Sequence, residues 1–376
     1  MSGSRKILII GAGVSAWLPA AILAARLPAT AYQITVCDTG DTRTDTLLAR
    51  PYICRAHDLI GIDDAALARH AAARPVHAYK VSTKTRGSVV LPFGDFGLPF
   101  LGAGFTHYWL RAHLTGQARP LSHYNLALRL DEAGGFLNKA PKGLPFLDYG
   151  YDFPRQAYCA LLKQIASRAG VRTLSGPVDG AEFNPSGLIE NITLAGTQIS
   201  PDLTVCAGHP VLPDPDLISR LAQSPNGLHI QATSDMPGAA LHQLQTGTMR
   251  LMSLWPGNTF TKWEKAELDR LYHAETSHIE DMTNLLENGP NMTAERPALQ
   301  RKRQVFAARG RVPAEDYEVF SKPEWLAAMF ASGLVPRHYD RLADRVSLEQ
   351  ATAMLTQIEN RIDQLLSQNA TTRRAI

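Results

Sequence analysis

The sequence predicts an α/β protein whose N-terminal part alternates strands and helices and whose C-terminal part is helical. The apolar run KILII (6–10) leads through two glycines into a helical stretch, and a second strand-like run follows at 32–38. Other apolar, strand-like runs recur as far as residue 210. Beyond Leu241, apolar residues recur at spacings of three and four, the period of an amphipathic helix. We therefore expect an α/β module over 1–240, interrupted by an insertion at about 81–150, and a helical subdomain over 241–376.

The opening stretch KILIIGAGVSAWLPAAILAARL (6–27) has two interpretations. It follows a basic start and is mostly apolar, as in a secretory leader or a membrane-spanning helix. However, Gly11 and Gly13 interrupt the apolar run after Lys6–Ile10, and a spanning helix needs about 20 apolar residues in succession. The alternative is a buried strand, a tight turn and a helix. We favour this second interpretation and expect no membrane span.

The turn after the first strand has the pattern G-x-G-x-x-A, which is typical of phosphate binding at the N-terminus of a helix. Gly11 permits the tight turn, Gly13 allows a pyrophosphate to approach the backbone, and Ala16 lets the helix pack closely on the strand. The helix N-terminus offers unpaired N–H groups to the phosphates. Asp38, at the end of the second strand, can accept a hydrogen bond from a ribose hydroxyl. We therefore predict a dinucleotide site at Gly11, Ala12, Gly13, Val14, Ser15, Ala16 and Asp38; a Rossmann unit that has lost its ligand is the alternative.

The later elements follow the same alternation. We expect an amphipathic helix over 154–169, strands over 171–183 and 188–196, and a buried strand within 201–210. In the final helix, one stripe of apolar residues is predicted to face the core, and Ser347 can cap the first turn. The stripe comprises Leu348, Ala351, Leu355, Ile358, Ile362 and Leu365.

Charge and cysteine content narrow the function classes. The net charge is only +3, with basic and acidic residues interleaved, so the sequence shows no nucleic-acid-binding stripe. The four cysteines lie far apart without a CxxC pair, which favours free thiols in a cytoplasmic protein. The histidines show neither HxxxH nor HExxH spacing, and His273 and His278 are predicted on different helix faces. We therefore expect no metal site.

Several stretches together resemble the flavin-dependent tryptophan halogenase family. They are GAGVSAW (11–17), YKVSTKTRG (79–87), the helix within LDYGYDFPRQAYCALLKQIASRAGV, PDLTVCAGHP (201–210) and FSKPEWLAAMFASGLVPRHYDRLAD near the C-terminus. The likeness runs in order from residue 5 to about 366, so the chain looks like a shortened, divergent member. It implies a Rossmann-type FAD-binding module of the GR2, monooxygenase-like kind.

The resemblance also implies a chemistry. In the family, reduced FAD supplied by a separate reductase reacts with oxygen to oxidise a halide, and a lysine positions the oxidant beside an aromatic substrate, free or carried on a peptide. Lys80 is the counterpart of that lysine, and Val178 and Gly208 fall in segments near the flavin. This register implies that the Lys80 amine is buried in a cavity. The residues alone permit a surface strand, with Lys80, Lys84 and Arg86 exposed on one face.

The chain also departs from the family pattern. The WxWxIP motif is absent, and a short connector follows His209 where the family has a long substrate-domain sheet. The second flavin motif is reduced to IQATSDMPGAAL (230–241), with Met236 in place of a glutamate. The glycine strap after the second strand is replaced by DTGDTRTDTLLARPYICRAHDL. Two functions stay open: a halogenase or halogenase-like monooxygenase of weakened activity, or a degenerate relative that binds flavin, a ligand or a protein partner.

Overall fold

The computed structural model describes residues 4–84, 87–210, 212–214, 216–292 and 295–373. The chain divides into two compact units, each built from two chain segments. Unit 1 comprises Met1–Arg74 and Tyr151–Thr276, and unit 2 comprises Pro75–Gly150 and Ser277–Ile376. The predicted boundary at residue 240 falls inside unit 1, because the helix that follows it packs on the N-terminal helix and on strands of that unit.

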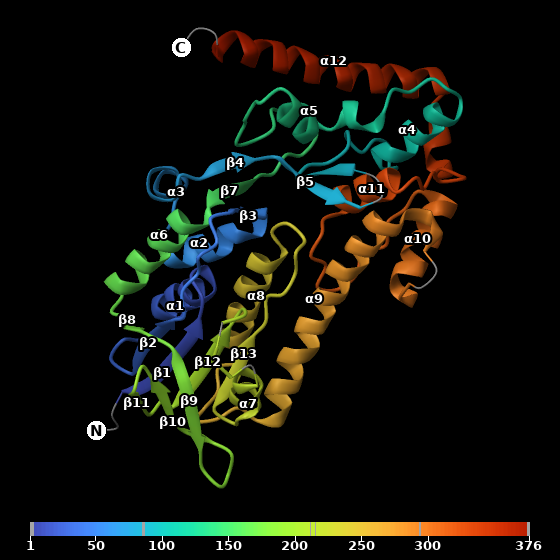
Figure 1. The fold of residues 1–376 in the computed structure, drawn as a ribbon. Coiled ribbons are helices and arrows are strands. Elements are labelled where there is room, and N and C mark those ends of the chain that lie inside the picture. The colour runs from blue at the N-terminus through green and yellow to red at the C-terminus, as the bar shows by residue number, and fades with distance from the viewer. Residues whose placement is uncertain (1–3, 85–86, 211, 215, 293–294, 374–376) are drawn as a thin grey trace. The chain divides into compact units, whose positions relative to one another are not determined.

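Unit 1 is built around a parallel sheet of five strands in the order β13-β12-β1-β2-β8 (Figure 1). Their bounds are β1 Arg5–Gly11, β2 Tyr32–Asp38, β8 Arg172–Ser175, β12 Leu203–Ala207 and β13 Gly227–Ile230. β1 and β12 are almost wholly buried, as their continuous apolar sequences predict. The predicted strands at 6–10 and 32–38 are thereby confirmed.

Different elements cover the two faces of this sheet. Leu8 and Ile10 pack in one hydrophobic cluster with Ile192 and Leu217, residues of a three-stranded antiparallel sheet and of α7. Ile7 and Ile9 point to the opposite face, where α1 packs against the sheet and against α6 and α8. The covering elements are α1 Val14–Arg26, α6 Arg155–Arg168, α7 Leu217–Gln223, α8 Ala239–Ser253, β9 Val178–Phe183, β10 Ile189–Leu194 and β11 Thr197–Ile199. These layers form the predicted Rossmann-type module.

The remaining elements of unit 1 are short helices and strands outside the parallel sheet. β3 pairs antiparallel with β7, and α8 packs against β3. The bounds are β3 Thr46–Ala49, η1 Pro51–Ile53, α2 Cys54–Ile60, α3 Asp64–Ala71 and β7 Gly150–Pro154. The long helix α9 (Lys262–Asn288) begins in unit 1 and ends in unit 2.

Unit 2 is mainly helical around one hairpin. β5 pairs with β6, α11 packs on β6, and α12 packs against α4 and α5. The bounds are β4 Arg74–Val76, β5 Ala78–Thr83, β6 Gly87–Pro92, α4 Phe105–Leu114, η2 Leu121–Tyr124, α5 Leu126–Glu132, η3 Gly289–Asn291, α10 Pro297–Arg309, α11 Lys322–Ala331, η4 Arg341–Arg345 and α12 Leu348–Arg373. The predicted α12 stripe is confirmed at Ala351, Leu355, Ile358 and Ile362, which are buried. The Ser347 hydroxyl accepts a hydrogen bond from the Gln350 N–H, as expected of a cap. Among the described residues, the helices are too short or too polar to cross a membrane.

Candidate functional site

A cavity of about 600 Å³ lies in unit 1 where the parallel strands end. Ala12, Val14 and Ser15 line it just beyond β1, and His209 lines it just beyond β12. The chain leaves β1 towards β2 on one side, whereas β12 lies on the other side, so this is the point at which the strand order reverses. Open α/β sheets bind ligands at such points, and 600 Å³ is a typical volume for a small-molecule or cofactor site.

The glycine turn has the close packing that its sequence predicts. A Cβ atom on Gly11 would lie 3.0 Å from both the Ala16 nitrogen and the Ala207 oxygen, so any side chain there would force backbone atoms to move apart. Ala16 is fully buried, and Gly13 adopts a positive φ of 55°. These two glycines and the small residue Ala16 therefore shape the start of α1 as the motif requires.

Asp38, the last residue of β2, forms hydrogen bonds with residues of this turn and with its neighbours. Its Oδ1 atom accepts hydrogen bonds from the N–H groups of Gly13 (2.9 Å) and Gly40 (3.0 Å), and its Oδ2 atom accepts one from Trp17 Nε1 (2.7 Å). The carboxylate that the sequence predicts to bind a ribose hydroxyl therefore already has three internal partners. Asp38 therefore holds the turn in shape, whatever else it binds.

The segment after β2 and the start of α6 contribute a ring of four charged residues to the cavity wall: Asp41, Arg43, Asp45 and Arg155. Arg43 binds Asp41 at 2.8 Å. Arg155 donates two hydrogen bonds to Asp45, at 2.5 and 2.6 Å, and lies 3.8 Å from Asp41. Both guanidinium groups that could meet a phosphate are thus already paired with carboxylates. We call these four residues the cavity ring.

Asp41 is the member of the cavity ring that contacts the glycine turn. A Cβ atom on Gly13 would lie only 2.7 Å from the Asp41 Cβ, so the space over this glycine is occupied by Asp41. Burial raises the pKa of Asp41, but hydrogen bonds and charge from Arg43 outweigh it, with help from Arg155, and the pKa is lowered overall. Asp41 therefore carries a negative charge beside the turn at neutral pH.

The reduced second motif (230–241) forms another wall of the cavity. Ala232, Asp235 and Met236 line it, together with Gly238 and Leu241 at the start of α8. Met236 is buried, so the position assigned to a glutamate is apolar here. The glycine turn and the reduced second motif, far apart in the sequence, therefore line the same cavity.

Three other predicted site residues do not line the cavity. Val178 is buried at the start of β9, packed in one cluster with Leu8 and Ile10. Gly208 has a positive φ of 66°, and a Cβ on it would lie 2.6 Å from Ser15 Oγ, so it keeps the end of β12 close to α1. Lys80 lies on β5 in unit 2, where it pairs with Val90 and its side chain is exposed. The expectation that Lys80 is buried is wrong.

The pattern around Lys80 explains the error. Tyr79 and Val81, on either side of it, are the buried residues, while Lys80 faces the other way, as alternation along a strand requires. Lys84 is also exposed, and Arg86 lies outside the described residues. The described part of this strand agrees with the surface alternative.

The residues missed from the sequence are those of the cavity ring. A run of charged residues at 38–45 directly after a strand tip was the available signal, because strand tips at this edge of a parallel sheet face the ligand site. The sequence around Arg155 gives no comparable indication, since only the fold brings the start of α6 to the edge of the sheet where the cavity lies.

Comparison with known proteins agrees with this architecture. The model of the family described as "Tryptophan halogenase" matches residues 6–212 and 234–348. Comparison with curated proteins gives no match.

Several solved structures share the fold over nearly their whole length. BrvH, a flavin-dependent halogenase from Brevundimonas sp. BAL3, is 19% identical with a TM-score of 0.84, and 97% of each chain is covered. Xcc4156, a flavin-dependent halogenase from Xanthomonas campestris, is 21% identical with a TM-score of 0.81, covering 100% of this chain and 98% of that one. A tryptophan 6-halogenase (SttH) from Streptomyces toxytricini is 12% identical with a TM-score of 0.76, covering 97% and 98%. At these identities the likeness is one of fold.

Proposed function

Because the chain belongs to the tryptophan halogenase family, we propose that the cavity of unit 1 binds FAD and that the protein oxidises an aromatic or indole group with reduced flavin and oxygen. The observation that supports this most directly is the cavity itself. It has the volume of a cofactor site, lies at the carboxyl ends of the parallel strands, and is lined by both the glycine turn and the second-motif segment.

The residues present fit the ADP half of FAD. The N-terminus of α1, beside Ala12 and Ser15, would hold the pyrophosphate through its N–H groups. Leu48, Met236 and Leu241 supply an apolar wall that excludes water. Bound in reduced form, FAD would supply two electrons to oxygen, and the partly reduced oxygen would then be the oxidant that accepts two electrons from a halide or the substrate.

The cavity ring sets the affinity that we expect. A pyrophosphate would have to approach Asp41 and compete with carboxylates for Arg43 and Arg155. Losing or exchanging a few hydrogen bonds, each worth about 1 kcal/mol net, weakens binding roughly ten- to a hundredfold. We therefore propose micromolar or weaker binding of FAD, with the reduced form delivered by a separate reductase.

Within this proposal, Lys80 is the candidate catalytic residue, on the strength of the family register alone. Its exposed side chain argues for weak activity, because a reactive amine must hold its oxidant away from bulk water. The substrate would be a small or peptide-borne aromatic group, and the halide is optional. We also propose a cytoplasmic location, which four free cysteines support.

The test is turnover by the whole chain. With FAD, a reductase, NADH, bromide and indole, we expect slow bromination and much uncoupled peroxide. Lys80→Ala should lower product formation at least about a hundredfold, the usual cost of losing one transition-state partner. Lys84→Ala removes another exposed lysine, four residues along the same chain segment, and should have no effect. Equal loss in both variants, or none in Lys80→Ala, would remove Lys80 from the mechanism.

A degenerate relative that binds flavin or another ligand without turnover is the second candidate. The exposed Lys80, the apolar Met236 and the self-paired cavity ring favour it. FAD binding without product or flavin-dependent peroxide formation would select this candidate over the enzyme.

A further inference from the structure

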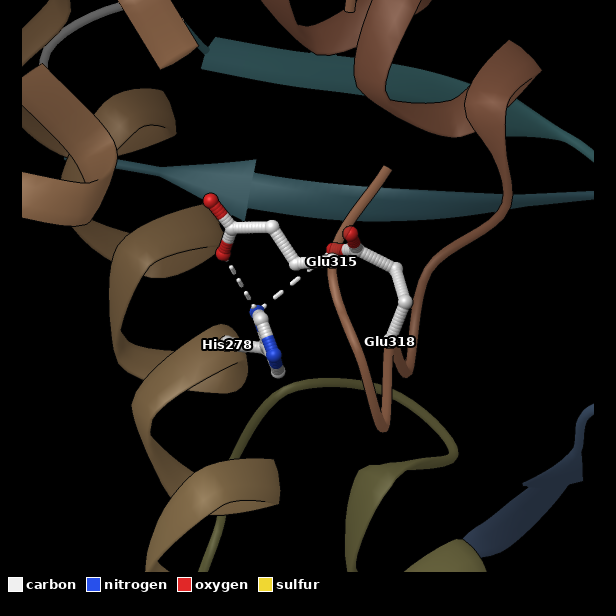
Figure 2. A group of neighbouring side chains, drawn as sticks. All are labelled: His278, Glu315 and Glu318. Carbon is white, nitrogen blue, oxygen red and sulfur yellow. Dashed lines mark ion pairs between the residues drawn. The ribbon is translucent and has the colours of Figure 1, made fainter. Parts of the chain in front are cut away.

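Three ionisable side chains from two separate chain segments converge in unit 2 (Figure 2). His278 lies on α9, while Glu315 and Glu318 lie on the segment between α10 and α11. His278 Nδ1 is 3.5 Å from Glu318 Oε1 and 3.7 Å from Glu315 Oε2. Tyr317, between the two glutamates, has a positive φ of 58°, which reverses the chain locally. We call these three residues the histidine–glutamate cluster.

The other ring nitrogen of His278 fixes its tautomer. Nε2 lies 3.0 Å from the backbone oxygen of Asp316, and a carbonyl oxygen only accepts, so Nε2 carries the hydrogen. In the neutral imidazole, Nδ1 then carries a lone pair and no hydrogen. This atom is buried and has no hydrogen-bond partner among the described residues, and it faces two carboxylate oxygens. The lone pair and the two anions repel one another, and the Lys302 ammonium, 3.0 Å from Glu318 Oε1 and 4.0 Å from Glu315 Oε2, offsets this repulsion only from the side of the carboxylates.

A proton on Nδ1 fits this geometry poorly. An N–H donor to a carboxylate should lie at about 2.7–2.9 Å from the oxygen, whereas both distances here exceed 3.4 Å. A metal ion fits better, because ligand atoms each about 2.0–2.2 Å from one ion lie about 3–4 Å apart. Ligating histidines also typically donate their second ring N–H to a backbone carbonyl, as His278 does here.

We propose that His278, Glu315 and Glu318 bind a divalent transition-metal ion of the zinc class, with water completing the coordination. One nitrogen and two carboxylate oxygens are ligands that Zn²⁺ accepts. The ion would connect α9 to the segment between α10 and α11 and would brace unit 2. This site does not depend on FAD binding in unit 1.

Neighbouring cations limit the affinity. Lys302 Nζ lies 3.0 and 3.1 Å from the two Glu318 oxygens, and Arg301 binds Glu315 at 2.6 Å. The two negative charges are therefore already balanced before a metal ion arrives. We expect binding weaker than at a structural zinc site made of cysteines and histidines.

The experiment uses the full chain, free of affinity-tag histidines and stripped with a chelator. Zn²⁺ is titrated by calorimetry, and Co²⁺ is used as a visible-absorption probe of nitrogen and oxygen ligation. We expect one site per chain. His278→Gln and Glu315→Gln should each weaken binding by more than the roughly 10- to 100-fold seen when only an outer-shell partner is lost. His273→Gln, which removes an exposed histidine five residues earlier on α9, should leave it unchanged.

Folding is checked by circular dichroism on each variant. Glu315→Gln serves as the second test should the buried His278 prove necessary for folding, since the partner Arg301 of Glu315 is largely exposed and tolerates the loss. An absent Zn²⁺ heat and Co²⁺ band in the parent would overturn the proposal. So would binding that His273→Gln abolishes or that Glu315→Gln leaves intact, because the metal would then lie elsewhere.

Discussion

The cavity ring of unit 1 and the histidine–glutamate cluster of unit 2 both pair carboxylates with cations, but the cluster also contains a buried nitrogen without a hydrogen-bond partner. In the ring, each carboxylate meets a guanidinium group, at 2.8 Å for Asp41 and at 2.5 Å for Asp45. In the cluster, an imidazole nitrogen without a hydrogen-bond partner faces two carboxylates at 3.5 and 3.7 Å. The charged groups of the cavity ring are paired with one another, so a ligand must displace these internal ion pairs. In the cluster the carboxylates are also paired, with Lys302 and Arg301, and the buried His278 Nδ1 is the atom left without a hydrogen-bond partner.

This difference shows that proximity of charged groups alone does not identify a binding site. A set of paired charges indicates what a ligand has to compete with, and here it lowers the expected affinity for an anionic cofactor. A polar atom left without a partner in a buried position indicates what a ligand would supply. The following substitutions test the comparison in each unit.

The largest effect is expected at Glu318. Lys302 is only 1% exposed, so Glu318→Gln removes the nearer counterion of a buried ammonium and leaves only Glu315, at 4.0 Å. We expect a loss of about 3–5 kcal/mol in the free energy of unfolding, measured by chemical denaturation. Asp45→Asn, at a half-exposed carboxylate of the cavity ring, should cost about 0–1 kcal/mol. Equal losses in the two variants would contradict the distinction between the two regions.

Next in size is the effect of Arg155 on cofactor affinity. Arg155→Met leaves Asp41 and Asp45 with one guanidinium group between them, so the cavity becomes more negative. We expect FAD to bind roughly ten- to a hundredfold more weakly, as measured by quenching of flavin fluorescence. Adding Asp45→Asn to this variant restores the charge balance and should recover most of the affinity. Failure of the double variant to recover would mean that Arg155 contacts the cofactor directly.

The smallest effect is expected at Asp41. Asp41→Asn removes the negative charge over Gly13 and should strengthen FAD binding by about five- to tenfold, or roughly 1 kcal/mol. Asp58→Asn, at an exposed position on α2, is the matched control and should change nothing. Weaker binding in Asp41→Asn would show that the carboxylate assists the cofactor rather than opposing it.

The sequence was most informative where geometry is local. Gly11, Gly13 and Ala16 indicate a tight turn and close packing. Small residues are needed at these positions wherever a strand turns directly into a helix, so their identity alone predicts the local structure. Lys80 is different, because the solvent exposure of a lysine depends on which strand face it occupies and on what packs there. Its neighbours Tyr79 and Val81 were the better indicators of the buried face.

The two charged regions depend on contacts between distant segments. Arg155 reaches Asp45 across 110 residues, and His278 meets glutamates 37 and 40 residues later. Motif spacing along one helix or loop cannot reveal such groups, since only the tertiary fold brings them together. The sequence predicts no metal site because the histidines lack the spacing of a local metal-binding motif. That spacing does not apply to ligands that come from separate helices and loops.

The central claim is that the cavity beside the glycine turn is the FAD site, and a titration of apo-protein with FAD tests it most directly. The parent should bind with a micromolar or weaker dissociation constant, and ADP should compete. Ala12→Asp places a carboxylate in the cavity wall without altering either glycine and should abolish binding, whereas Ala29→Asp, on the surface after α1, should not. A parent that ignores FAD, or an Ala12→Asp variant that binds like the parent, would contradict the claim.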